Sequence, residues 1–92
     1  MLGQRINELR QARGWSQVEL AKRLNISKQT VSNWENDNIQ PSIEMLIRIS
    51  KLFGVTTDYL LGLDEIPRLS IEDLPHNFLA HLAMLIDDYR AK

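Results

Sequence analysis

Residues 17–36 read QVELAKRLNISKQTVSNWEN, and this stretch decides the fold that we predict for the chain. Its apolar residues recur at helical spacing on both sides of a short break at Asn25. Ala21 is small enough to let two helices cross closely, and Asn25 tolerates the left-handed conformation that a tight turn needs. We therefore predict two short helices that cross at a steep angle around this turn.

The second of these helices has a polar outer face. The apolar residues of the stretch would close a core beneath it, and they are Leu20, Leu24, Ile26, Val31 and Trp34. The residues left on the outer face are Lys28, Gln29, Ser32 and Asn33. Their side chains are rich in hydrogen-bond donors and acceptors, as contact with base edges in the major groove requires. The alternative interpretation is a surface helix that only faces solvent.

Working outward, residues 2–62 carry the start and stop signals of five short helices. Residues that favour helix starts precede four of the apolar segments, and they are Ser16, Ser27, Ser42 and Thr56. Glycines that favour helix ends follow three of them, at Gly14, Gly54 and Gly62. Strand-like alternation is scarce, so we predict an all-α domain at residues 1–62.

Residues 2–62 resemble the phage repressor and Cro family, whose module is the Xre-type helix-turn-helix domain. The motifs that carry this resemblance are Ser16-Gln17 with Leu20-Ala21, Val31-Ser32-Asn33-Trp34-Glu35, Pro41-Ser42 and Asp58-Tyr59-Leu60-Leu61-Gly62. The resemblance implies a five-helix Cro/repressor-like fold and sequence-specific binding of double-stranded DNA by a transcriptional regulator.

The resemblance also implies a role for each polar residue around the turn. The implied base-reading residues are Lys28, Gln29, Ser32 and Asn33. The implied DNA-backbone contacts are Gln17, Thr30 and Asn36, and the implied structural ion pair is Arg10 with Glu35. The chain departs from the family at Asn25 and Asp37, where many members have glycine. Both residues tolerate the left-handed conformation, so we expect the fold to be kept.

The C-terminal part is predicted to be a linker at residues 63–70 and an amphipathic helix at 71–92. Ser70 would open this segment, with Pro75 in the first helical turn. Its apolar residues fall within an arc of about 140°, and they are Leu74, Phe78, Leu79, Leu82, Leu85, Ile86 and Tyr89. We predict a dimer interface formed by Phe78, Leu82, Leu85, Ile86 and Tyr89. The alternative is that the helix covers its own domain.

The predicted helix that follows Ser42 supports the same idea. Its polar face is narrow, and Ile43 and Ile47 extend the apolar arc beyond what one core needs. We expect a second surface to cover that side. A homodimer would also let two modules contact half-sites about one helical turn apart.

Charge is unevenly distributed along the 92 residues. Residues 1–62 carry eight Lys/Arg and six Asp/Glu, a net charge of +2, whereas residues 63–92 carry three and six, a net charge of −3. A phosphate-binding face is therefore expected in the first part. The predicted function is a DNA-binding transcriptional regulator that acts as a homodimer on a two-fold operator. The alternative is an antitoxin or protein-interaction module whose C-terminal helix docks a different protein.

Other functional classes find little support in the sequence. The chain has no cysteine, no HExxH motif and no glycine loop of the kind that cradles phosphate. His76 and His81 are five residues apart, which places them on different faces of a helix and makes a poor metal pair. We expect no enzyme activity, no cofactor and no metal. The sequence lacks a long apolar run, so we expect a cytoplasmic protein without membrane association.

Overall fold

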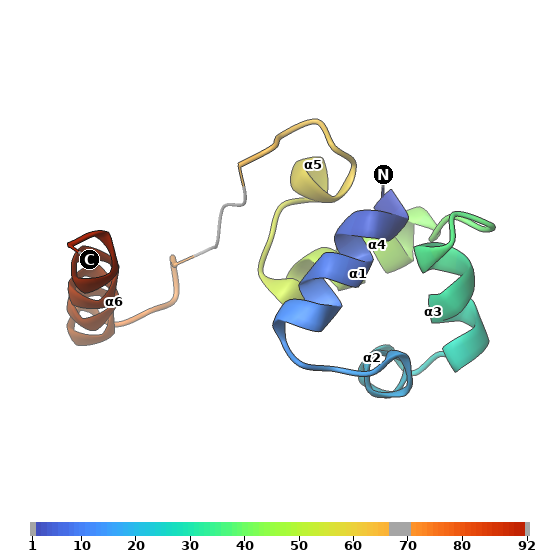
Figure 1. The fold of residues 1–92 in the computed structure, drawn as a ribbon, viewed down its shortest axis with the longest axis horizontal. Coiled ribbons are helices and arrows are strands. Elements are labelled where there is room, and N and C mark those ends of the chain that lie inside the picture. Colours follow the sequence, from blue (N-terminus) through green and yellow to red (C-terminus); the bar gives the residue numbers. More distant parts are fainter. Residues whose placement is uncertain (1, 67–70, 92) are drawn as a thin grey trace.

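The computed structural model describes residues 2–66 and 71–91, and within these ranges it contains six helices and no strand (Figure 1). The helices are α1 (Leu2–Ala12), α2 (Gln17–Leu24), α3 (Lys28–Glu35), α4 (Ile43–Phe53), α5 (Thr57–Leu60) and α6 (His76–Arg90). The predicted all-α fold, with five helices and one more near the C-terminus, is confirmed.

The first five helices surround one apolar core. Ile6 of α1, Leu20 of α2, Val31 of α3 and Ile49 of α4 have no exposed surface. The remaining buried apolar residues are Ala21, Leu24, Trp34, Phe53, Val55 and Leu60. All of them lie between positions 6 and 60, so the five-helix domain closes its core without α6.

The predicted caps form as local hydrogen bonds. Each of Ser16, Ser27, Ser42 and Thr56 accepts a bond from the backbone N–H three residues later, at 3.0 to 3.2 Å. These bonds satisfy donors that a helix start otherwise leaves without a partner. Gly14, Gly54 and Gly62 adopt the predicted positive φ angles at the helix ends.

The start of α6 differs from the prediction. The helix begins at His76 and not near residue 71, and Pro75 occupies the N-cap position with an extended ψ of 155°. Proline disfavours helical conformation in the residue before it, so the turn at residues 72–74 does not continue into the helix. Pro75 therefore precedes the first turn and is not inside it, and Ser70 lies outside the described residues.

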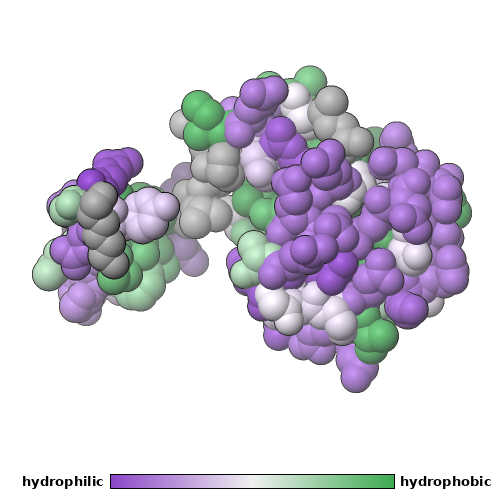
Figure 2. All heavy atoms as spheres, viewed as in Figure 1, coloured by the Kyte–Doolittle hydropathy of each residue, from purple (hydrophilic) through white to green (hydrophobic). Residues whose placement is uncertain are grey.

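Helix α6 lies apart from the five-helix domain (Figure 1) and has no buried residue. Phe78 and Ile86 are about half exposed, and Leu85 and Tyr89 are 65% and 80% exposed. Apolar side chains are visible on this helix in Figure 2. Most of the apolar stripe of α6 is therefore exposed, although Leu79 and Leu82 are half-buried. None of the helices in the described ranges has the length and apolar character to cross a membrane.

Candidate nucleic-acid interface

The turn between α2 and α3 has the geometry that the sequence predicted. Asn25 ends α2 with φ 56° and ψ 48°, which is the left-handed conformation. The backbone N–H of Ile26 donates to the Ala21 carbonyl oxygen at 2.9 Å, so the chain reverses close to α2. Ala21 is only 4% exposed, and its small side chain leaves room for α3.

A residue of α4 also fixes the end of α2. The Arg48 guanidinium donates a 2.8 Å hydrogen bond to the backbone oxygen of Leu24. Carbonyl groups in the last turn of a helix lack partners within it, and a cation is favourable there. Arg48 therefore holds the turn against the rest of the domain, a role that the sequence did not reveal.

The four predicted base-reading residues lie on the outer face of α3. Lys28 and Gln29 are exposed, while Ser32 and Asn33 are half-buried. The Gln29 amide nitrogen donates to the Asn33 side-chain oxygen at 3.1 Å. The Asn36 amide donates to the Ser32 hydroxyl at 3.3 Å. Hydrogen bonds between neighbouring side chains therefore orient the polar groups on this face of α3.

The three predicted backbone-contact residues lie at helix ends around this face. Gln17 begins α2, and Asn36 follows α3 as its C-cap. Thr30 lies in the first turn of α3, where its hydroxyl is 2.8 Å from the hydroxyl of Ser27. The structure thus places them at the margins of the polar face and not within it.

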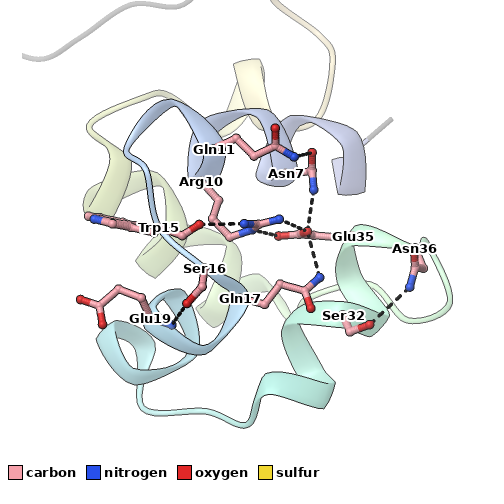
Figure 3. Close-up of polar contacts among 10 residues, drawn as sticks. All are labelled: Asn7, Arg10, Gln11, Trp15, Ser16, Gln17, Glu19, Ser32, Glu35 and Asn36. Atoms are coloured by element: carbon pink, nitrogen blue, oxygen red, sulfur yellow. Dashed lines mark hydrogen bonds and ion pairs between the residues drawn. The ribbon is translucent and has the colours of Figure 1, made fainter.

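A buried carboxylate holds α3 against α1 (Figure 3). Arg10 Nε lies 2.8 Å from Glu35 Oε2, and Arg10 Nη2 lies 3.0 Å from Glu35 Oε1. The side chains of Arg10 and Glu35 are only 12% and 4% exposed. Two parallel charge-assisted bonds of this kind fix both distance and orientation. The ion pair that the resemblance implied is present.

Glu35 also accepts two amide hydrogen bonds. Gln17 Nε2 donates to Glu35 Oε1 at 3.2 Å, and Asn7 Nδ2 donates to the same oxygen at 2.8 Å. Gln11 in turn donates to the Asn7 side-chain oxygen at 2.8 Å. One carboxylate of α3 therefore joins α1 and α2 (Figure 3). Asn7 was not predicted as a member of this network, although it lies three residues before Arg10 on the same face of α1.

Residues 6–60 match the protein family described as Helix-turn-helix. The chain belongs to this family. The family match and the helix arrangement confirm the resemblance and the fold that the sequence predicted.

Relatives of this helix-turn-helix protein include the HTH-type transcriptional regulator ImmR of Bacillus subtilis (strain 168). The two are 44% identical over 73 residues, which cover 79% of this chain and 58% of ImmR. The chain therefore spans less than two thirds of the length of that relative.

Two solved structures are also similar. A crystal structure of the master regulator for biofilm formation SinR in complex with DNA is 35% identical, with a TM-score of 0.61, and the match covers 66% of this chain and 98% of that one. A complex of SinR with the SinI protein is 29% identical, with a TM-score of 0.62, and covers 98% and 79%.

The loop after α3 of this helix-turn-helix domain contains another contact that the sequence did not predict. Asp37 has the left-handed conformation, with φ 57°, and we expected it to tolerate this conformation. Its side-chain oxygen accepts a 3.2 Å bond from the backbone N–H of Gly3 in the first turn of α1. A Cβ atom at Gly3 would collide with the carbonyl oxygen of Trp34. The start of α1 thus fits tightly against the end of α3.

Trp15 does not present its ring for stacking on bases. It is half-buried, and its ring lies 5.6 Å from that of Phe53. The Arg23 guanidinium covers the indole at 4.0 Å, and Arg10 donates to the Trp15 carbonyl oxygen at 2.7 Å. Trp15 is therefore a packing residue. In residues 2–66 and 71–91, no group of three or more His, Asp or Glu side chains is arranged to hold a metal ion.

The Glu35 network makes the stability of the domain depend on pH. Burial raises the pKa of Glu35, but hydrogen bonds from Arg10, Asn7 and Gln17 and the Arg10 charge together bring it below its ordinary value. Ionised Glu35 therefore stabilises the folded domain. This stabilisation is fully present above the pKa of a glutamate in the unfolded chain, about 4.3, and it is lost as the pH falls through the lower pKa of Glu35 in the folded domain.

We therefore expect the melting temperature to fall when the pH is lowered from about 5 toward 3, because Glu35 then binds a proton more readily in the unfolded chain than in the folded protein. Thermal melts monitored by circular dichroism, for the natural chain and Glu35→Gln, measure this effect. The natural chain should lose more stability than the variant across that range. Equal slopes for the two proteins would show that Glu35 does not contribute to the acid sensitivity.

Proposed function

We propose that this protein is a sequence-specific double-stranded DNA-binding regulator of transcription that inserts α3 into the major groove. The observation that carries this proposal is the polar face of α3, which Lys28, Gln29, Ser32 and Asn33 form on a helix held by the Glu35 network. The similarity to the regulator ImmR and to SinR bound to DNA supports it. We also propose that it acts in the cytoplasm and that it catalyses no reaction.

The side chains of this face suit the major groove chemically. Asparagine and glutamine can bond both adenine N6 and N7, and lysine can bond guanine O6 and N7. Gln29 and Asn33 already share a hydrogen bond, so less side-chain freedom is lost when they meet a base. Ser32 lies beside them and can donate or accept.

Gln17 is suited to a phosphate contact. Its amide nitrogen carries two hydrogens, and one of them is used on Glu35. The second hydrogen remains for a phosphate oxygen near the N-terminus of α2, where the helix dipole favours a negative charge. Thr30 and Asn36, at the margins of the same face, are proposed to contact the DNA backbone as well.

The protein is proposed to act as a homodimer, with residues 1–62 binding DNA, 63–70 as a linker and 71–92 as the dimer element. Two apolar surfaces support this proposal. One is the stripe of α6, and the other is the side of α4 where Ile43 and Ile47 are 79% and 43% exposed. A two-fold dimer would place two copies of α3 on half-sites about 34 Å apart.

A second candidate function rests on the same exposed stripe. An antitoxin or a partner-controlled regulator would use α6 to bind a different protein, and the similar SinR structure contains the SinI protein. The two candidates differ in the state of the purified chain. A stable homodimer favours the first function, whereas a monomer that becomes soluble or stable only with another protein favours the second.

The DNA face can be tested by selection of binding sites from random duplexes. We expect Gln29→Ala and Asn33→Ala each to weaken binding to the preferred site by about 1–3 kcal/mol and to relax the preference at particular base pairs. Asn38→Ala, in the exposed loop after α3, is the matched control and should keep the natural preference. Unchanged preferences for both α3 variants would contradict the assignment.

Gln17 should behave differently from these residues. We expect Gln17→Ala to weaken binding to all duplexes by a similar factor, because a phosphate contact carries no direct base information. Fluorescence anisotropy with the preferred duplex and with a scrambled duplex measures the two affinities. Gln4→Ala, which removes an exposed glutamine of α1 outside the hydrogen bonds to Glu35, is the control. A loss that is confined to the preferred duplex would assign Gln17 to base contact instead.

A further inference from the structure

We infer that α6 pairs with α6 of a second copy in the antiparallel direction. This inference rests on the proposed homodimer and adds its geometry. No residue of α6 is buried. Leu79 and Leu82 of its apolar stripe are half-buried, and Leu85 and Ile86 beside them are exposed. The charges on the helix, the side chains that flank the stripe and the length of α6 together select a second copy in this direction.

The charges of α6 are concentrated at one end. Asp87 and Asp88 lie in the last turn, whereas the first turn holds no acidic residue. The C-terminus of a helix also carries a partial negative charge. At about 100° per residue Asp87 lies on the side of α6 opposite the stripe, so parallel pairing would bring together the two Asp88 carboxylates and two such helix ends. Antiparallel pairing places each acidic end beside the first half of the other helix, which holds no Asp or Glu, while Glu72 and Asp73 precede that helix.

One flank of the stripe provides a complementary contact. At about 100° per residue, His81 and Asp88 fall on the same side of the stripe. Both are exposed. In an antiparallel pair centred near position 84, like flanks meet, so His81 of each copy lies beside Asp88 of the other. An imidazole N–H can donate to that carboxylate. Parallel pairing would bring His81 beside the opposite flank, where Ala83 lies.

The length of α6 fits the proposed operator. Its 15 residues span about 22 Å. In an antiparallel pair the two linkers leave at opposite ends, so the two DNA-binding domains start about one helix length apart. This separation is about two thirds of the spacing of about 34 Å between successive half-sites, and each linker has to supply the remainder. A parallel pair would bring both linkers to one end.

Cysteine cross-linking of the full chain distinguishes the two directions, because the natural chain contains no cysteine. Phe78 and Tyr89 mark opposite ends of the stripe, and both are exposed. We expect a mixture of Phe78→Cys and Tyr89→Cys proteins, one of them carrying a mass tag, to form a mixed disulfide dimer on mild oxidation. Each variant alone should cross-link poorly, because two Phe78 positions would be about 20 Å apart, beyond disulfide reach.

Charge reversal provides an independent readout in solution. His81→Glu would place a carboxylate beside Asp88 of the second copy and should weaken the dimer roughly fivefold, as for two exposed ion contacts. Adding Asp88→Lys should restore the natural dissociation constant. His76→Glu on the other flank is the matched control and should change it little. Sedimentation equilibrium measures all four proteins.

Each outcome of these experiments either supports or overturns the antiparallel pairing of α6. Self-cross-linking of Phe78→Cys, or a failure of Asp88→Lys to rescue His81→Glu, would overturn the antiparallel pairing. A dimer that forms no cross-link in the mixture would place the interface elsewhere. A natural chain that sediments as a monomer would overturn both the pairing and the proposed homodimer, and a monomer that associates only with a foreign protein would favour the second candidate function. The selection of DNA sites tests the DNA-binding proposal separately.

Discussion

Replacing Glu35 by alanine is expected to lower the free energy of unfolding by about 3 kcal/mol. The change leaves the Arg10 guanidinium without its carboxylate at a site where the arginine side chain is only 12% exposed. It also removes the acceptor of the Asn7 and Gln17 amides. Buried hydrogen-bond donors without an acceptor and buried charges without a partner are among the few causes of a large loss of stability from a single substitution.

A double-mutant cycle separates this network from general loss of packing. Glu35→Ala combined with Arg10→Met should be more stable than Glu35→Ala alone, because the double variant buries no unpaired charge. The matched control is Glu19→Ala, which removes the pair with Arg23, where both side chains are more than 40% exposed. That change should have an effect below about 1 kcal/mol. Additive effects of the Arg10 and Glu35 changes would mean that the two residues act independently.

Local features of this fold could be predicted from the sequence, because each rests on a few neighbouring residues. Ser27 caps α3 by accepting a bond from a backbone N–H three residues away. Asn25 adopts the left-handed conformation, which its short polar side chain tolerates. The faces of α3 follow from helical periodicity, so the spacing of the four outer residues is enough to assign them to one face.

Contacts between distant segments were harder to predict. The bond between Asp37 and the backbone of Gly3 joins residues 34 positions apart. Nothing near Asp37 in the sequence indicates that α1 begins beside it. The convergence of Asn7 and Gln17 on Glu35 depends on how three helices pack, which periodicity alone does not determine.

The first residue of α6 was predicted wrongly for a different reason. Pro75 disfavours helical conformation in the residue before it, so α6 begins at His76 and not near residue 71. The partner of α6 is not determined by periodicity either. An apolar stripe shows that a surface needs cover, but the covering surface can belong to the same chain or to another one.

Ending the chain at Gly62 is expected to abolish the dimer and to weaken binding to a two-half-site operator about 100-fold or more. Two linked modules bind the second half-site as an intramolecular event, and this advantage is lost in a monomer. The shortened chain retains every buried apolar residue between Ile6 and Leu60, so it should still fold. Sedimentation at tens of micromolar and anisotropy with the operator measure the two effects.

The affinity for a duplex with one half-site shows whether the loss comes from dimerisation. The shortened and full chains should bind this duplex nearly equally, because residues 1–62 supply all the proposed DNA contacts. In the full chain, Leu85→Asp on the stripe should reproduce the loss, since a buried carboxylate without a partner disrupts an apolar interface. Met84→Asp, at an exposed position on the other side of α6, should not. If the shortened chain dimerises as well as the full one, the dimer is held by another surface, and the exposed side of α4 at Ile43 and Ile47 is then the one to test.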